Sequence, residues 1–289
     1  MTQFPRPRPA ARVSALESWI RSKAQQDGED VARLRRSIGY VVVSAVLAQM
    51  KDNDGGPLFV VKGGVAMQLR FAGRARLSKD FDAAFRRDLD ALEAVLSHAP
   101  RHAVGPFVVR AVGKPQPIGP TGVFRQTLDI RYGPSGQGFG KVLLEISRAE
   151  GQSGDPARLD WVDPWPDITA FGLPTAGPVP CMPVAYQIAQ KLHACTEVLR
   201  HKANERFHDL LDLQLLAELL DGEGWRATRL ACEETFAARG THAWPPVVVV
   251  YPQWREGYAR VAAENGFPIV EIDDARARVE ALIARIAAS

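Results

Sequence analysis

The fold is decided by LFVVKGGVAMQLRFAGRARLSKDFDAAF, which runs from Leu58 to Phe85. Its first residues are apolar and β-branched, which predicts a buried strand. The pair Gly63-Gly64 ends that strand, and a helix is predicted after it. A second strand follows with Asp80 and Asp82, whose side chains share a face because strand side chains alternate. The stretch therefore predicts a strand–helix–strand unit that carries two neighbouring carboxylates.

Two like charges on one face repel each other unless a cation lies between them. Mg²⁺ is the expected cation, because it prefers carboxylate oxygens. A third acid on a neighbouring strand would complete the metal site of Asp80 and Asp82. Glu145 is preferred, since it lies mid-strand in an apolar setting and needs a partner. Asp129 on the paired strand is the alternative, and it could instead form a cross-strand ion pair with a nearby arginine.

The Gly63-Gly64 turn opens a helix, and backbone amides at a helix start are suited to phosphate. The alternative is a tight strand–helix turn that needs a positive φ. Charge is uneven around this turn: residues 61–140 hold twelve Lys/Arg and six Asp/Glu, whereas the whole chain is only +3. A basic rim around an acidic pair suits a nucleotide or RNA, and a solvated surface with incidental arginines is the alternative.

Composition excludes several protein classes. The 289 residues, 46% hydrophobic and 24% charged, suit one large or two modest globular domains. No apolar run is long enough to span a bilayer, and the N-terminal residues lack the apolar region of a secretory signal. Three widely spaced cysteines argue against a disulfide framework and a zinc site. We therefore expect a cytoplasmic protein without membrane contact.

The remaining pattern predicts an α/β (α+β) lobe over residues 1–175 and a mainly helical lobe over 176–289. The boundary lies in 151–183, which holds seven prolines and four glycines. Periodicity predicts N-terminal helices, then a short helix and three strands, and helices again after the boundary. The segments are helices at 15–26, 29–51, 88–99, 184–200, 206–220, 228–239, 254–263 and 273–287, and strands at 107–112, 124–132 and 141–147.

Lys191 lies at the border of the apolar stripe of the predicted helix 184–200. A lysine there is commonly a surface residue whose stem covers apolar neighbours. The next helix carries Arg206, Asp209 and Asp212 at successive i+3 steps, which places them on one face. A surface Arg206–Asp209 pair is one interpretation. The functional one is that these groups face a catalytic cleft, with Lys191 on phosphate and Asp212 fixing the lysine or the base.

The order Gly-Gly, helix, Ser-x-Asp-x-Asp is the layout of a nucleotidyltransferase core. Together with QKLHACTEVL and RFHDLLDLQLL downstream, it resembles the AbiEii-type nucleotidyltransferase toxins of type IV toxin–antitoxin systems, especially the MenT-like members. The resemblance covers Leu58 to Leu220, with four motifs in the same order. It implies a nucleotidyltransferase-like mixed-sheet lobe, a mainly helical C-terminal lobe and a central cleft.

The resemblance also implies roles for residues at matching positions. Its motif acids and lysine imply catalytic roles for Asp80, Asp82, Lys191 and Asp212. The nucleotide would be bound by Gly63, Gly64, Ser78, Lys191 and Arg239, and Mg²⁺ by Asp80, Asp82 and Glu145. Three positions depart from the family pattern: Val198 stands where many members have arginine, Glu145 where aspartate is commoner, and Gly63-Gly64 where older nucleotidyltransferases have Gly-Ser.

The implied activity is transfer of nucleotides from NTP, pyrimidines preferred, to the 3′ acceptor end of tRNA, which blocks translation. A cognate antitoxin opposes such toxins, in some cases through phosphorylation of the serine that matches Ser78. Basic residues between Arg70 and Arg87 would help to hold the RNA. Two alternatives remain open: a nucleotidyl- or phosphotransferase that acts on a protein hydroxyl, Ser78 included, and an inactive module that binds RNA or a partner.

Overall fold

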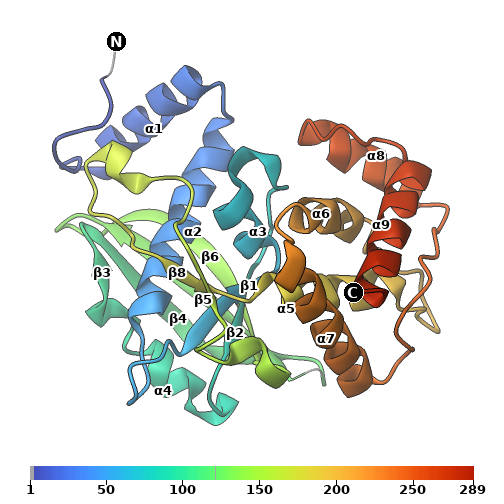
Figure 1. Cartoon of the computed structure of the whole chain (residues 1–289). Coiled ribbons are helices and arrows are strands. Elements are labelled where there is room, and N and C mark those ends of the chain that lie inside the picture. Colours follow the sequence, from blue (N-terminus) through green and yellow to red (C-terminus); the bar gives the residue numbers. More distant parts are fainter. Residues whose placement is uncertain (1–2, 121) are drawn as a thin grey trace. The chain divides into compact units, whose positions relative to one another are not determined.

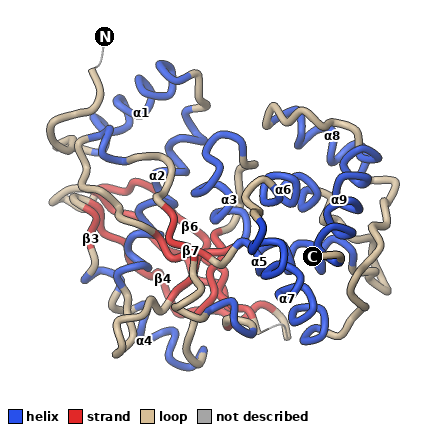
Figure 2. Tube along the Cα trace, viewed as in Figure 1, coloured by secondary structure: helices blue, strands red, loops and turns tan. Residues whose placement is uncertain are grey.

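A computed structural model describes residues 3–120 and 122–289 of the chain. It divides into two compact units (Figures 1 and 2). The first comprises Met1–Ala72 and Leu77–Met182, and the second Gly73–Arg76 and Pro183–Ser289. The division thus falls seven residues after the boundary expected at 175, and the short loop before Ser78 is counted with the second unit.

The first unit is built on a mixed sheet that has eight strands among the described residues. Their order is β3-β4-β5-β6-β2-β1-β8-β7. Strands β1 and β2 are antiparallel, β2 runs parallel to β6, and β3 to β6 form an antiparallel series. The strands are β1 Phe59–Lys62, β2 Phe81–Phe85, β3 Ala103–Val104, β4 Phe107–Ile118, β5 Val123–Tyr132, β6 Gln137–Arg148, β7 Asp160–Val162 and β8 Val179–Cys181.

One face of this sheet carries the hydrophobic core. Helix α2 (Val31–Gln49) runs across it in Figure 1, and its residues 37–47 are all buried. Asp30 caps α2 by accepting a hydrogen bond from the Arg33 backbone N–H. Phe81, Ala83 and Phe85 of β2 point into the core, so the alternation of the strand sends Asp82 to the opposite face. The other helices of this unit are α1 Val13–Asp27, α3 Gly63–Phe71 and α4 Leu92–Leu96.

The second unit is helical. Pro183 precedes α5, as expected for a residue that has a fixed φ and no N–H to lose at a helix start. Asp221 caps α7, accepting from the Gly224 N–H, and Gly240 ends it in the left-handed conformation. The helices are α5 Val184–Thr196, α6 His208–Ala217, α7 Gly222–Arg239, α8 Trp254–Glu264 and α9 Ile272–Ala287.

The predicted mixed α/β class with a helical C-terminal part is confirmed, and the differences are local. The proline-rich segment 151–183 contributes β7 and β8, whose three residues each are too short for a periodic signal. The expected helix 88–99 is reduced to α4 between short 3-10 turns, the last of which contains Pro100. Among the described residues, no helix is both long and apolar enough to span a membrane.

Candidate active site

Four charged residues lie in one row across the solvent side of the sheet in the first unit. Asp82 of β2 lies opposite Lys62 of β1 and opposite Glu145 of β6. Glu145 in turn lies opposite Arg125 of β5. Directly opposed residues have Cβ atoms about 5 Å apart, so the two acids are neighbours with a cation on each side. We call Lys62, Asp82, Glu145 and Arg125 the acid row.

Glu145 already has a cationic partner. Its Oε1 accepts hydrogen bonds from Arg125 Nη2 at 2.5 Å and Nε at 3.2 Å. On the other side, Lys62 Nζ donates to Ser147 Oγ at 2.8 Å. The geometry favours Glu145 over Asp129 as a third acid, because Asp129 lies four residues further along β5 than Arg125, about 13 Å away. Asp129 also accepts from Arg131 Nε at 2.6 Å, an ion pair within β5 and not the cross-strand pair that was its alternative role.

The two glycines are explained by the side chains that lie against them. Gly63, the first residue of α3, has a φ of +61°, and a Cβ placed on it would lie 2.2 Å from Asp82 Oδ2. A Cβ on Gly64 would lie 2.6 Å from Ser78 Oγ. Neither position has room for a side chain. The carboxylate of Asp82 thus lies at the start of α3, where the helix dipole favours negative charge.

Ser78 and Asp80, just before β2, are held by hydrogen bonds. The Ser78 hydroxyl donates to the Asp80 carbonyl at 2.8 Å, and its N–H donates to Gln68 Oε1 at 3.2 Å. The Tyr40 hydroxyl donates to the Ser78 carbonyl at 3.0 Å. Burial raises the pKa of Tyr40 to about 12, and the charges of Asp80 and Asp82 add to the rise. Tyr40 therefore stays a neutral donor, and Ser78 is only 6% exposed.

Among the described residues, no three His, Cys, Asp or Glu side chains are grouped as a ready metal site. The donors still suit a hard divalent cation in kind, since Asp82 and Glu145 are adjacent carboxylates and Asp80 lies two residues before Asp82. Arg125 now occupies part of the space that a cation would take at Glu145. The three acids suit Mg²⁺ by donor type, and Glu145 would have to release Arg125 before it could bind such an ion.

We expect Gly63→Ala to destabilise the protein more than Gly136→Ala does. Gly136 has a φ of +60°, but nothing lies within 4 Å of its added Cβ. The control therefore contains the backbone strain, of order 1–3 kcal/mol, without the clash with Asp82. Urea unfolding of both variants measures the difference. Equal losses of stability in the two variants would mean that the Asp82 carboxylate does not exclude a side chain at residue 63.

In the second unit, Lys191 is buried between two acids. Its Nζ donates to Asp209 Oδ1 at 2.8 Å and to Asp212 Oδ2 at 2.5 Å. Arg206 Nε donates to Asp209 Oδ2 at 2.7 Å, and Arg76 Nη2 to Asp212 Oδ2 at 3.2 Å. Both aspartates have fully buried side chains, and that of Lys191 is 6% exposed. We call these five residues the lysine cluster.

The charges of the lysine cluster do not cancel. Three cations face two carboxylates, which leaves one positive charge in excess, and of the three cations only Lys191 is buried, since the Arg206 side chain is 48% exposed. Burial alone would raise the pKa of Asp209, but the charges of Lys191 and Arg206 outweigh it and hold that pKa below its usual range. Lys191 and Arg76 do the same for Asp212. Both acids are therefore ionised, and Lys191 is not the surface lysine that its position on the helix also allowed.

One acceptor of the cluster has no protein donor. Both bonds to Asp212 end on Oδ2, whereas its buried Oδ1 has no hydrogen-bond partner among the described residues. A buried carboxylate oxygen without a donor is costly, so Oδ1 is suited to accept from a ligand or a water molecule. Sequence reasoning missed the contribution of Arg76 and did not pair Asp209 with Lys191.

We expect Lys191→Met to destabilise the protein by about 3–5 kcal/mol, because two buried carboxylates lose their shared cation. Adding Asp209→Asn and Asp212→Asn should restore much of that loss. Lys23→Met is the matched control: Lys23 pairs with Asp27 on the surface of α1, and such pairs contribute little. Urea unfolding measures all the variants. A loss for Lys191→Met no larger than for Lys23→Met would contradict the role of the cluster.

His208 gives the second unit a pH dependence. Burial lowers its pKa to about 4, although Asp209, 3.8 Å from its Nε2, acts to raise it. The folded protein therefore keeps His208 neutral where the unfolded chain, with a pKa near 6.5, binds a proton. Stability from this residue is complete above pH ~6.5 and decreases as the pH falls toward 4.

We therefore expect the free energy of unfolding to fall between pH 6.5 and 4, with His208 contributing up to about 1.4 kcal/mol per pH unit. His208→Gln should flatten this slope. Urea unfolding at closely spaced pH values measures it, with His98→Gln, a variant of an exposed histidine, as the control. Parallel curves for wild type and His208→Gln would contradict the prediction. The stability from Asp209 and Asp212 is lost in a lower window, below about pH 4.

A chain of hydrogen bonds begins at the C-terminal end of α5. The Thr196 hydroxyl donates to the Leu192 carbonyl at 2.7 Å, so it accepts from His242 Nε2 at 2.8 Å. Burial lowers the pKa of His242, and the neutral ring can then accept at Nδ1 from Thr241 Oγ at 3.0 Å. The single hydroxyl hydrogen at each threonine thus sets the tautomer of His242.

Arg239 lies at the other end of this chain. Thr241 Oγ has given its hydrogen to His242, so it accepts from His193 Nε2 at 3.0 Å, and His193 Nδ1 accepts from Arg239 Nη1 at 3.4 Å. Residues 191 and 193 point about 200° apart around a helix. Arg239 is therefore placed with His193 and not with the lysine cluster, and its contact with nucleotide stays a prediction.

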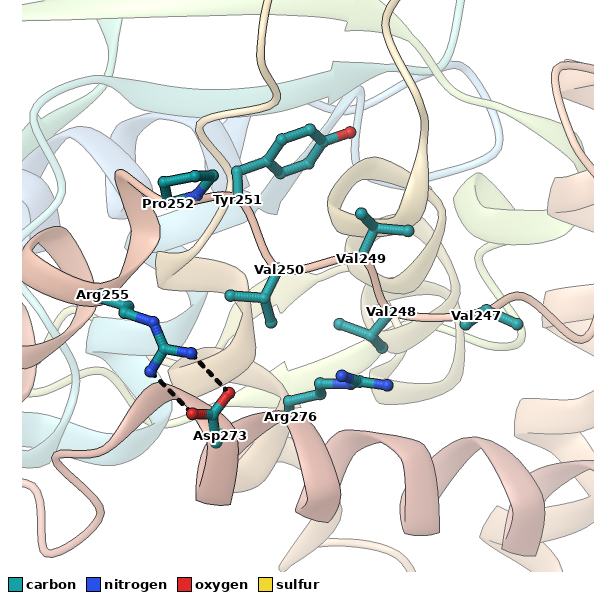
Figure 3. A pocket seen from close by; sticks show the side chains of 9 residues that line it. All are labelled: Val247, Val248, Val249, Val250, Tyr251, Pro252, Arg255, Asp273 and Arg276. Atoms are coloured by element: carbon teal, nitrogen blue, oxygen red, sulfur yellow. Dashed lines mark hydrogen bonds and ion pairs between the residues drawn. The ribbon is translucent and has the colours of Figure 1, made fainter.

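A pocket of about 570 Å³ lies elsewhere in the second unit (Figure 3). It contains none of the predicted site residues. Arg255 and Asp273 on its wall are tied to each other at 2.7 Å. The lining consists of Val247, Val248, Val249, Val250, Tyr251, Pro252, Arg255, Asp273 and Arg276.

Comparison with known families gives a match over most of the chain. A family model described as "Nucleotidyl transferase AbiEii toxin, Type IV TA system" matches residues 45–284. That span includes both the acid row and the lysine cluster. No curated protein matches the chain.

Proposed function

The chain belongs to the AbiEii nucleotidyl transferase toxin family of type IV toxin–antitoxin systems, and we propose that it transfers a nucleotide from an NTP to the 3′ end of an RNA. The expected acceptor is the end of tRNA, and the expected consequence is a block of translation. Membership of the family makes the protein a toxin enzyme with a nucleotide substrate and an antitoxin partner. The RNA, the metal and the roles of residues belong to the proposal.

The observation that carries the proposal is the pairing of Asp82 with Glu145 across β2 and β6, next to the start of α3. Adjacent carboxylates at a helix start form a site for a divalent cation that bridges to phosphate oxygens. Mg²⁺ held by Asp80, Asp82 and Glu145 would neutralise charge on the triphosphate and on the leaving pyrophosphate. Arg125, displaced from Glu145, would then be available to a phosphate.

In the reaction, the acceptor 3′-hydroxyl oxygen forms a bond to the α-phosphorus while the bond to pyrophosphate breaks, and the hydroxyl loses its proton. In the second unit, Lys191 carries a fixed positive charge suited to a phosphate, because Asp209 and Asp212 hold its ammonium group in place. Asp212 Oδ1 accepts a hydrogen bond from a hydroxyl of the substrate. Contact of the Gly63-Gly64 turn with phosphate stays a prediction, since the side chains of Asp82 and Ser78 fill the space beside the two glycines.

Transfer onto the enzyme's own Ser78 is less favoured by the geometry. The Ser78 hydroxyl is buried, donates to the Asp80 carbonyl and lies against Gly64. An attacking oxygen must be exposed to its phosphorus, so Ser78 would first have to leave these contacts. Intact-mass measurement with each NTP distinguishes the outcomes, since a nucleotide adduct and a phosphate adduct differ in mass.

The proposal is tested by incubating the protein with each α-labelled NTP, Mg²⁺ and bulk tRNA. We expect label in tRNA, with one NTP preferred, and loss of transfer when EDTA removes the metal. Asp80→Asn should lower the rate by about 100-fold or more, because it removes a charge that acts on the reacting phosphate. Asp88→Asn, in a side chain that is 79% exposed, should leave the rate unchanged. Growth arrest by a wild-type protein that labels no RNA would refute the proposal.

A further inference from the structure

The basic residues from Arg70 to Arg87 are mostly engaged within the protein. Between residues 70 and 87, four of the six basic side chains form ion pairs with acids. Side chains committed in this way are poor candidates for holding RNA, which was their predicted role. The pairs are Arg70–Asp160, Arg74–Glu218, Arg76–Asp212 and Arg86–Asp52.

A second charged row crosses the sheet on β4, β5 and β6. Asp129 of β5 lies opposite Arg110 of β4 and opposite Lys141 of β6, and it accepts from Arg131 at 2.6 Å. Arg110, Asp129, Lys141 and Arg131 are the basic row, with a net charge of +2. Arg110 and Lys141 are exposed, and within residues 3–120 and 122–289 neither side chain has an ion pair or hydrogen bond.

The basic row and the acid row share the solvent side of the sheet. Arg125 and Asp129 are four residues apart on β5, so alternation puts them on one face, about 13 Å apart. Between the rows lie uncharged residues of the three strands: Val112, which is 47% exposed, Thr127 and Leu143. The reverse face of these strands is core. The result is an open surface that runs along β4–β6 from the basic row to the acid row.

We propose that this surface, the strand track, binds the backbone of the acceptor RNA and leads its 3′ end to the acid row. The inference rests on the proposed function, since it concerns the second substrate of the same site. Arg110 and Lys141 are unneutralised cations that can each contact a phosphate of the RNA backbone. The acid row has no net charge, and in the proposed reaction it binds the metal and the phosphates at the reacting 3′ end. Val112 and Leu143 offer apolar contact to a sugar or base between the two rows.

Charge placement favours nucleic acid over an acidic protein segment. Phosphate contacts need isolated cations on an open surface, which Arg110 and Lys141 provide. A protein interface of similar strength needs an apolar centre. Among the described residues of the strand track, Val112 is the one large apolar side chain that is clearly exposed, which is too few for such a centre. The acceptor contacts assigned here are backbone contacts, so they predict affinity without sequence preference.

The test compares Arg110→Ala/Lys141→Ala with Arg21→Ala/Arg101→Ala. The control removes the same charge from exposed positions of the first unit outside both rows. Binding of labelled tRNA is measured from 50 to 300 mM KCl. The strand-track variant should bind about tenfold more weakly at low salt, and the slope of log K against log[KCl] should fall by about 1.4–1.8, because each lost phosphate contact removes about 0.7–0.9. The control should bind like wild type.

Asp129→Asn gives a change of opposite sign, since removal of the acid raises the net charge of the basic row, and tRNA should bind more tightly. Wild-type affinity and slope in Arg110→Ala/Lys141→Ala would overturn the proposal, as would an equal loss in the control. So would loss of binding to the purified antitoxin with tRNA binding intact, because the surface would then serve a protein.

Binding of each NTP with Mg²⁺, measured separately by calorimetry, keeps the two proposals distinguishable. Arg110→Ala/Lys141→Ala should bind NTP as wild type does. If wild type transfers no nucleotide but the variant still loses tRNA affinity and slope, the proposed reaction fails and the strand track is supported. If wild type transfers nucleotide to tRNA and the variant does so with unchanged tRNA KM, the strand track fails and the reaction stands.

Discussion

The approach of the Asp82 carboxylate to the Cα of Gly63 is the constraint on which the first unit depends. It exists because β1 and β2 are antiparallel and place Lys62 opposite Asp82, so the residue that starts α3 faces the acid. The parallel pairing of β2 with β6 then adds Glu145 beside Asp82. A single register error would send these charges to the core face. The strand–helix–strand unit is therefore both the centre of the sheet and the frame of the candidate site.

The second unit solves a different electrostatic problem. The three buried groups of the lysine cluster, Lys191, Asp209 and Asp212, are expensive to bury, and well-packed apolar residues would give similar or better stability. Such an arrangement has a use if a fixed cation is needed at a fixed place. Asp209 and Asp212 keep the Lys191 ammonium immobile, so little reorganisation remains when an anion binds. The cluster carries one positive charge in excess, which would favour an anion at this position.

Sequence reasoning found the strand–helix–strand unit, the acids and the buried lysine because they lie in local patterns. It missed β7 and β8, whose few residues pair only through the tertiary fold. It also assigned RNA to the arginines near Ser78, since their partners Asp160, Glu218, Asp212 and Asp52 are distant in sequence. The choice between Glu145 and Asp129 needed the register of β5 and β6. Each of these points depends on long-range pairing, which periodicity does not show, and the role of Glu145 as third acid stays a prediction.

The contact between Gly64 and the Ser78 hydroxyl has a consequence for the evolution of this family. The Ser78 side chain fills the space that a side chain at residue 64 would need, since a Cβ on residue 64 would lie 2.6 Å from Ser78 Oγ. Sequences that carry Gly-Ser at the turn must therefore place their hydroxyl at residue 78 elsewhere or replace it. The two positions should covary, and a lineage that acquires a side chain at the turn gives up a buried serine two residues before Asp80.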